Sequence, residues 1–235
     1  MRSIGLGLAI TAGFALGCSS EALSDSNPAS PPAAGGQAGA SSTAGGTSSV
    51  DAAPAPYPSG PYGRGEGAVI ENLSFLGWRD PAGANYDVNR LEVVRLSDFY
   101  NPGGSADGVR LLVLNASAVW CSVCRVEYQH LNTRGTYAQY RPKGVEILGV
   151  IFEDNEYAPA KPSDLRFWGG PEGFEVTFPL VLDPGFKTGI YFSSDATPLN
   201  LLIDATTMRI VDVLMGYDAS NPDTYWRRID ELLGP

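Results

Sequence analysis

Two short apolar runs with an amphipathic stretch between them constrain the fold more than any other part of the sequence. Residues 109–115 (VRLLVLN) follow turn residues and have the length of a buried strand. Residues 122–140 carry apolar side chains roughly on one face of a helix, which the turn at 141–144 (RPKG) ends. A second buried strand is expected at 145–152 (VEILGVIF). This order predicts a parallel βαβ unit with a right-handed crossover, and therefore an α/β fold.

Further short elements are expected on both sides of this unit. Before it, strands are expected around residues 68–75 and 91–94. After it, the sequence predicts a short helix at 163–168, a strand at 178–182, an antiparallel hairpin of 199–203 and 210–215, and a C-terminal helix at 223–233.

The N-terminus has the pattern of an export signal. After Arg2, residues 4–16 form an uncharged run of 13 residues, which suits a signal-peptide core and is too short to span a bilayer. A small residue followed by Cys18 resembles a bacterial lipoprotein signal, in which the cysteine is lipidated and becomes the first residue. Such signals usually carry Leu where this chain has Ala15, so an ordinary secretory signal with an incidental cysteine is the alternative. Either signal exports the protein.

The next segment is rich in small residues, since 34 of the 42 residues at 19–60 are Ala, Gly, Ser, Thr or Pro. With so few aliphatic side chains it cannot offset the entropy lost on ordering, so we expect a disordered tether. A disordered leader with no anchoring role is the alternative. The predicted organisation is a signal peptide at 1–17, a tether at 18–60 and a folded domain at 61–235. With a lipid on Cys18, the following Ser19 favours the outer membrane, by resemblance to the enterobacterial sorting rule.

Composition excludes several classes of function. One histidine in 235 residues excludes a multi-histidine metal site and argues against a catalytic triad. The formal charge of −10 argues against nucleic acid as a partner, because binding phosphates requires a basic surface. Beyond the N-terminus no apolar run is long enough to predict a membrane-spanning helix.

The cysteines point to thiol chemistry. There are three, Cys18, Cys121 and Cys124, and lipidation of the first would leave a C-x-x-C pair in a compartment that permits disulfides. A disulfide that closes so short a loop adds little to stability. Half a zinc site is the alternative, but only His130 could add a further ligand of the usual kind. We therefore expect a redox pair, with no metal and no cofactor.

A longer motif around this pair carries a family resemblance. Residues 115–127 (NASAVWCSVCRVE) and the later pair Thr197-Pro198, just before a predicted strand, resemble the TlpA/ResA-like thiol–disulfide oxidoreductases. The resemblance covers roughly residues 66–235. It implies a thioredoxin-like fold, with a central mixed β-sheet flanked by helices and extra N-terminal strands at 66–98.

The roles of the two cysteines follow from their position at a strand-to-helix junction. Cys121 would lie at a helix N-terminus, where unpaired N–H groups and the helix dipole favour a thiolate. The thiolate is the attacking species, so Cys121 is the expected nucleophile. Cys124, one turn further and less exposed, would then attack the mixed disulfide. A purely structural disulfide is the alternative.

The resemblance implies roles for three residues near the cysteines. Trp120 is expected to shield the site and to offer a flat apolar surface to partner peptides, although core packing is an alternative role. Pro198 is expected to follow a cis peptide bond and to face the cysteines, with a trans proline at a strand start as the alternative. The backbone of Thr197 would pair with an extended substrate.

Glu127 is the expected proton-handling group. It lies three residues beyond Cys124, on the same helix face. In TlpA/ResA-like proteins, a glutamate at this position is implicated in proton handling near the thiols. Burial and a neighbouring thiolate would raise the pKa of its carboxyl group, which could then shuttle a proton. A surface glutamate is the alternative. Asn115 stands where cytosolic thioredoxins have a buried Asp, which makes Glu127 the better candidate.

The sequence also departs from the family. Residues 116–119 (ASAV) replace the usual aromatic and small residues, and residues 128–129 (YQ) stand where a proline usually follows the glutamate. These departures concern the surface that meets a partner and leave the two thiols unchanged. His130 is expected to be a solvated helical residue without a catalytic role.

The predicted function is an enzyme, an exported and lipid-anchored thiol–disulfide oxidoreductase of the cell envelope, on its periplasmic side. Its expected partners are exported thiol or disulfide proteins, with a membrane thiol carrier as electron donor if it acts as a reductant. Three alternatives stay open: a peroxiredoxin-like peroxidase, a Sco-like copper chaperone, and a redox-inert interaction domain. Peroxidase sites carry P-x-x-x-T/S-x-x-C and copper chaperones C-x-x-x-C with a distant histidine, and the residues here match neither pattern.

Overall fold

The computed structural model describes residues 55–132 and 134–234. They belong to a unit that spans Ala52–Pro235. The predicted signal peptide, the lipidation site at Cys18 and nearly all of the predicted tether lie outside the described residues. None of the helices in the described part is both long enough and apolar enough to cross a membrane.

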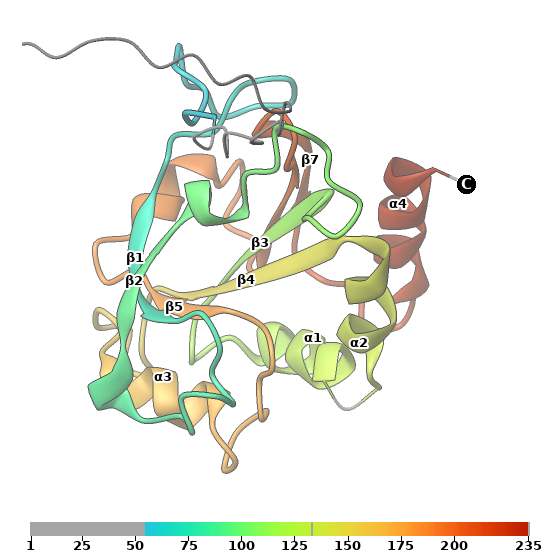
Figure 1. Cartoon of the computed structure of the whole chain (residues 1–235). Helices are drawn as coiled ribbons and strands as arrows, with labels where there is room; N and C mark the ends of the chain where they lie inside the picture. The colour runs from blue at the N-terminus through green and yellow to red at the C-terminus, as the bar shows by residue number, and fades with distance from the viewer. Residues whose placement is uncertain (1–54, 133, 235) are drawn as a thin grey trace, which may run out of the picture. The chain divides into compact units, whose positions relative to one another are not determined.

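The described residues form a mixed seven-stranded sheet in the order β2-β1-β5-β4-β3-β6-β7 (Figure 1). The strands are β1 (Ser74–Trp78), β2 (Glu92–Arg95), β3 (Leu111–Ser117), β4 (Val145–Ile151), β5 (Leu180–Leu182), β6 (Leu199–Asp204) and β7 (Arg209–Met215). Strand β3 is parallel to β4 and antiparallel to β6, and all seven of its residues are buried. The predicted parallel unit and the predicted hairpin of β6 and β7 are therefore confirmed, and β1 and β2 are the extra N-terminal strands.

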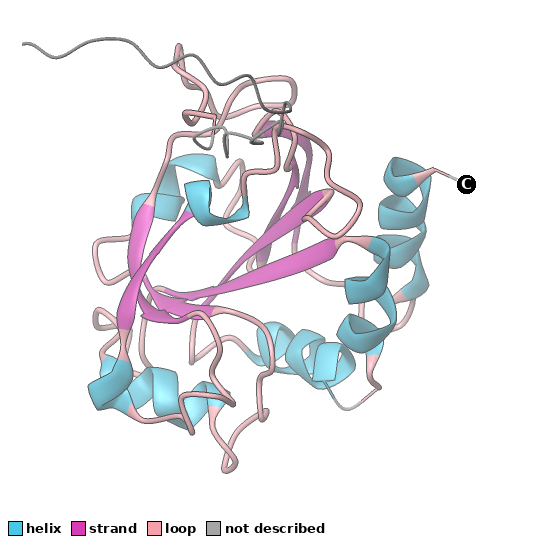
Figure 2. Ribbon diagram, viewed as in Figure 1, coloured by secondary structure: helices cyan, strands magenta, loops and turns pink. Residues whose placement is uncertain are grey.

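The described residues form four α-helices, and two of them lie on the same face of the sheet. The helices are α1 (Ser122–Asn132), α2 (Thr136–Tyr140), α3 (Pro162–Gly169) and α4 (Asp223–Leu233). The crossovers β3-α1-β4 and β4-α3-β5 step in the same direction across the sheet, so right-handed connections put α1 and α3 on one face. Tyr128 of α1 accordingly packs edge-on against Trp168 of α3, with ring centroids 5.0 Å apart, and Figure 2 shows both helices below the strands.

Aromatic side chains fasten the helices to the core. Trp78, Trp168 and Trp226 are all buried in the core. Trp226 of α4 stacks on Tyr140 of α2 with ring centroids 4.5 Å apart, which joins the C-terminal helix to the βαβ unit. Large buried aromatic rings contribute strongly to core stability, so this contact holds α4 beside the site described below.

The structure differs from the sequence predictions at three places. The helix expected at 122–140 is two helices, because Gly135 adopts a left-handed conformation with φ of 65° between them. The strand expected at 68–75 starts only at Ser74, and the residues before it form isolated bridges at Val69. Tyr57, inside the segment predicted as a tether, packs against the core, and its hydroxyl donates to the carbonyl oxygen of Ile70.

A close approach in β4 makes one glycine necessary. A Cβ atom on Gly149 would lie closer than van der Waals contact to the hydroxyl of Tyr128 and to a methyl group of Leu180. Gly149→Ala is therefore expected to destabilise the fold by about 1–3 kcal/mol, because the rings packed around Tyr128 leave it no room to move. Denaturant unfolding measures the effect. Gly103→Ala is the matched control, since a Cβ atom there meets nothing within 4 Å, and equal effects of the two changes would contradict the prediction.

Candidate active site

The two cysteines lie where strand β3 gives way to helix α1. They form a disulfide, and Cys121 precedes the first residue of the helix. The backbone N–H of Cys124 donates to Sγ of Cys121 over 3.1 Å. This is one of the N–H groups that the first turn of a helix leaves without a backbone partner, and in the dithiol form the same donor would stabilise a thiolate. Cys121 is 4% exposed and Cys124 is fully buried, which matches the expected order of exposure.

The residues before β6 lie beside this disulfide. The Thr197–Pro198 peptide bond is cis, as the motif predicted. Strands β3 and β6 are antiparallel neighbours, with Ala116 opposite Leu199, so the start of β6 lies at the end of β3 where the cysteines are. Sγ of Cys121 is 3.9 Å from the carbonyl oxygen of Thr197. Because a disulfide sulfur carries no proton, this is a contact rather than a hydrogen bond.

Glu127 is buried in a network of amide side chains. Its carboxylate accepts a hydrogen bond from Nδ2 of Asn115 at 2.7 Å and another from Nδ2 of Asn200 at 2.9 Å. Asn115 also accepts from the hydroxyl of Ser117 and donates to the amide oxygen of Asn200, to which Tyr225 also donates. The surface position that was the alternative for Glu127 is therefore excluded. Among the described residues, an ionised Glu127 carboxylate has two side-chain hydrogen-bond donors and no ion-pair partner.

Burial dominates the proton affinity of this carboxyl group. Desolvation raises the pKa of Glu127 to about 7, although the hydrogen bonds from Asn115 and Asn200 act in the opposite direction. Burial and a nearby thiolate are both expected to raise this pKa, and in the disulfide form the cause is burial. A group with this pKa can both bind and release a proton near neutral pH.

Asn200 is a site residue that the sequence analysis missed. It lies directly opposite Asn115 in the register of β3 and β6, so both amides point to the face that α1 covers. The available signal was an asparagine in each of two mostly apolar runs, at 109–115 and 199–203. A polar side chain in a buried strand requires a partner, and here the two strands supply it to each other and to Glu127.

Trp120 is partly buried against the loop that follows β4. Its indole N–H donates to the carboxylate of Glu153 at 2.8 Å. Its ring stacks on that of Tyr157, with centroids 5.1 Å apart, and Tyr157 is 69% exposed. The two rings therefore form an aromatic surface beside the disulfide. Neither Glu153 nor Tyr157 stood out in the sequence, because only the fold brings this loop to Trp120.

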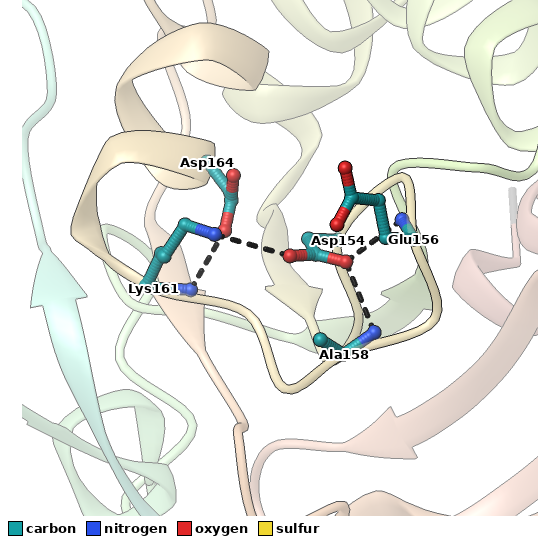
Figure 3. Close-up of polar contacts among 5 residues, drawn as sticks. All are labelled: Asp154, Glu156, Ala158, Lys161 and Asp164. Carbon is teal, nitrogen blue, oxygen red and sulfur yellow. Dashed lines mark hydrogen bonds and ion pairs between the residues drawn. The ribbon is translucent and has the colours of Figure 1, made fainter. Parts of the chain in front are cut away.

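A buried carboxylate holds that loop in shape (Figure 3). Asp154 accepts hydrogen bonds from the backbone N–H groups of Glu156 and Ala158, at 2.8 and 3.0 Å. Its second oxygen forms an ion pair with Lys161 at 3.1 Å, and the backbone N–H of Lys161 donates to Asp164 in the first turn of α3. Tyr157 lies between the two anchored N–H groups, so the backbone that carries its ring is held in place.

His130 corrects a prediction. It was expected to be solvated, but its side chain is buried and its Nδ1 shares a hydrogen bond with the hydroxyl of Tyr217. Desolvation, with a smaller effect of Arg134, lowers the pKa of this imidazole. The prediction failed because the segment after β7, which covers this face of α1, is remote in the sequence. In the part of the chain that the structure describes, no group of three or more Cys, His, Asp or Glu side chains could hold a metal ion.

Fold and site together define the class. A disulfide at the N-terminus of α1, beside a cis-proline that precedes the antiparallel strand β6, is the arrangement that the sequence motif predicted for a thioredoxin-like domain. The structure is similar to that of a protein from Chlorobium tepidum described as thiol:disulfide interchange protein DsbE, with a TM-score of 0.52 and 20% identity. That likeness covers 74% of this chain and 99% of the other. The predicted thioredoxin-like fold is confirmed.

The sequence is similar to curated thiol–disulfide proteins. It is 27% identical over 103 residues to the thiol-disulfide oxidoreductase ResA of Bacillus cereus, across 44% of this chain and 53% of that protein. It is also 27% identical over 152 residues to the thiol:disulfide interchange protein HelX of Rhodobacter capsulatus, across 65% of this chain and 77% of that protein. The chain therefore matches about half the length of ResA. No family model matches the chain. The resemblance inferred from the motif is confirmed.

Proposed function

We propose that the chain is a thiol–disulfide oxidoreductase that exchanges disulfides with other proteins, here called clients. The observation that carries the proposal is the Cys121–Cys124 disulfide at a helix N-terminus, with an N–H donor on Sγ of Cys121 and the carbonyl of Thr197 beside it. The donor favours Cys121 as the thiolate and leaving group. The names of the relatives, ResA and HelX, agree with this chemistry.

The exchange takes two steps. The Cys121 thiolate attacks one sulfur of a client disulfide, the client S–S bond breaks, and the second client sulfur leaves as a thiolate that takes up a proton. Cys124 then loses its proton and attacks Sγ of Cys121. The mixed disulfide breaks, the Cys121–Cys124 bond forms, and the client leaves as a dithiol. Two electrons pass to the client, and in reverse a client dithiol reduces the disulfide.

Glu127 is proposed to handle the proton of the second step. It lies one helical turn beyond Cys124 and, like Cys124, is buried. Cys124 must lose its proton in a place that water does not reach freely. A carboxylate with a pKa of about 7 can accept that proton and later release it. Trp120 and Thr197 are proposed to contact the client, and Pro198 to shape the backbone there.

The peroxidase alternative lacks support from the site. Such a site needs a hydroxyl near the reactive cysteine to position peroxide. The nearest upstream hydroxyl, on Ser117, is buried and donates to Asn115, which leaves it engaged in the network around Glu127. No observation favours copper binding.

Reduction of insulin and equilibration with glutathione test the proposed function. The protein with dithiothreitol should precipitate reduced insulin well above the rate of dithiothreitol alone. The same protein, incubated in glutathione buffers of graded potential, should titrate as one two-electron couple. A disulfide that neither accelerates insulin reduction nor equilibrates with glutathione would contradict the proposal.

We also propose that the protein is exported and held on the periplasmic side of the cell envelope by a lipid on Cys18. The segment at 18–60 would act as a tether, and the outer membrane is favoured over the inner membrane. The uncharged N-terminal run followed by a small residue and Cys18 supports this. Exported thiol or disulfide proteins would be the clients, and a membrane thiol carrier would supply electrons to the Cys121–Cys124 disulfide.

Fractionation of cells that express the full chain or Cys18→Ala should show the parent in membranes and the variant in the soluble fraction. Equal distribution would contradict anchoring at this residue.

A further inference from the structure

A groove of about 530 Å³ opens beside the disulfide. Trp120 and Thr197, the two residues next to Cys121 in chain and in space, both line it. The rest of its wall comes from the loop after β4 and from residues 186–195, which precede the cis-proline. A client cysteine at Cys121 would therefore bring its flanking residues to this groove, here called the phenylalanine groove because Phe152, Phe186 and Phe192 line it.

Phe186 and Phe192 form an apolar surface that is only partly covered and that packs on the buried ring of Phe152. Phe186 packs on Phe152 and Phe192, with ring centroids 4.6 and 5.4 Å away. Phe186 nevertheless remains 43% exposed. An apolar side chain of matching size could cover the exposed part of Phe186 and gain the free energy of removing that surface from water.

Phe186 is also held in an unusual backbone conformation. Its φ is 48° and its ψ is 43°, in the left-handed region that bulky residues rarely adopt. Its ring lies over Gly189, where a Cβ atom would approach the ring to 2.6 Å. The chain thus combines a strained residue and a glycine to lay a half-exposed phenylalanine along the groove. Conformations of this kind cluster at binding sites.

The rim of the groove is acidic. Glu153 and Asp195 both line it, and neither forms an ion pair with another described residue. One carboxylate oxygen of Glu153 accepts from the indole of Trp120. None of the described residues that line the groove is Lys or Arg. A cation in the groove would meet two carboxylates, which attract it.

We propose that the phenylalanine groove selects client segments in which a large apolar residue and a basic residue stand next to the reactive cysteine. This inference rests on the proposed function and adds the class of client sequence that the site prefers. The apolar side chain lies on Phe186, and the basic side chain reaches Glu153 and Asp195. A segment with an acidic residue in the same position meets two like charges and is disfavoured.

Matched peptide substrates test the preference. Three short peptides share one internal disulfide and differ only in the two residues beside the first cysteine, which are Phe-Lys, Phe-Glu or Gly-Lys. A second set carries the same pairs on the other side of the cysteine. The dithiol form of the full chain reduces each peptide, and kcat/KM is measured by quenched mass spectrometry. In one of the sets, Phe-Lys should exceed both other peptides by roughly threefold or more at low salt, and added salt should shrink the lysine preference.

Variants assign the preference to the groove. The double change Glu153→Gln and Asp195→Asn keeps an acceptor for the Trp120 indole and should bring the ratio of Phe-Lys to Phe-Glu close to one. Phe186→Ala should bring the ratio of kcat/KM for Phe-Lys to that for Gly-Lys close to one. Each ratio is taken within one variant, so a change in thiol reactivity cancels. Asp107→Asn, an exposed carboxylate in the loop before β3, is the matched control and should keep both ratios.

The outcomes separate the two proposals. Failure to reduce any peptide would overturn the proposed function. Reduction of all three peptides at equal rates in both sets would overturn only the preference. A lysine preference that survives loss of both carboxylates would overturn the assignment to this groove, and its loss in the double variant alone would support it.

Discussion

Cys121→Ser is expected to reduce disulfide exchange with insulin to the uncatalysed background. The Cys121 sulfur is the one that a backbone N–H contacts and the one nearer to Thr197, whereas Cys124 is fully buried behind it. An alcohol at this position is not ionised near neutral pH and forms no disulfide, so the first step has no nucleophile.

Cys124→Ser is expected to behave differently, although it removes the partner in the same disulfide. Cys121 keeps its helix N-terminus and can still attack a client, but no second sulfur resolves the product. A Cys121–client mixed disulfide should therefore accumulate and be visible by non-reducing electrophoresis and mass spectrometry. Cys18→Ser is the control, because it removes a cysteine outside the proposed site. The assignment of roles would be wrong if Cys121→Ser trapped clients and Cys124→Ser did not.

The stability of the disulfide form is expected to fall between about pH 4.5 and pH 7, and Glu127→Gln is expected to remove this part of the pH dependence. In the folded chain, burial raises the pKa of Glu127 from 4.5 to about 7. The unfolded chain releases this proton first as the pH rises, so the folded chain binds more protons within that window. Stability then decreases with pH, and above the folded pKa the loss is complete.

The size of the effect follows from the same shift. One pKa unit corresponds to about 1.36 kcal/mol, so the difference contributes at most about 3 kcal/mol. Denaturant unfolding without reductant, at pH 5 and at pH 8, gives the free energy for the parent and for Glu127→Gln. Their difference isolates this residue from other carboxyl groups such as Glu146, whose pKa burial also raises. Glu172→Gln, at an exposed position, is the control, and parallel pH profiles for parent and Glu127→Gln would contradict the prediction.

Local sequence patterns predicted most of the elements and the position of the cysteines. Apolar runs of strand length and the turn residues around them define β3 and β4 within two residues. Helix N-termini are local as well, so the placement of Cys121 needed only the chain around it. The helix break was harder, because Gly135 inside an amphipathic pattern is compatible with either outcome.

The remaining parts of the site depend on pairing between distant segments. The two hydrogen bonds that Glu127 accepts require the register that puts Asn115 opposite Asn200, and no local sequence pattern determines that register. The environment of His130 depends on Tyr217, which lies 87 residues away in the chain. Likewise, Phe186 and Glu153 become neighbours of Trp120 only through the folded loops. The motif therefore predicted the thiol–disulfide chemistry, but it did not predict which distant residues surround Glu127, His130 and Trp120.

Cys121 and Thr197 are 76 residues apart in the chain, yet they stand at the ends of two hydrogen-bonded neighbours, β3 and β6. The intervening chain leaves the sheet after β3 and returns to it at β6, the strand that pairs with β3. The segments at 153–161 and 183–196 belong to that intervening chain, and they carry most of the residues that line the groove. Insertions or substitutions in these segments can change which clients bind, while the distance between Sγ of Cys121 and the carbonyl oxygen of Thr197 stays the same. The architecture thereby lets selectivity and electron exchange evolve, or be engineered, as separate modules.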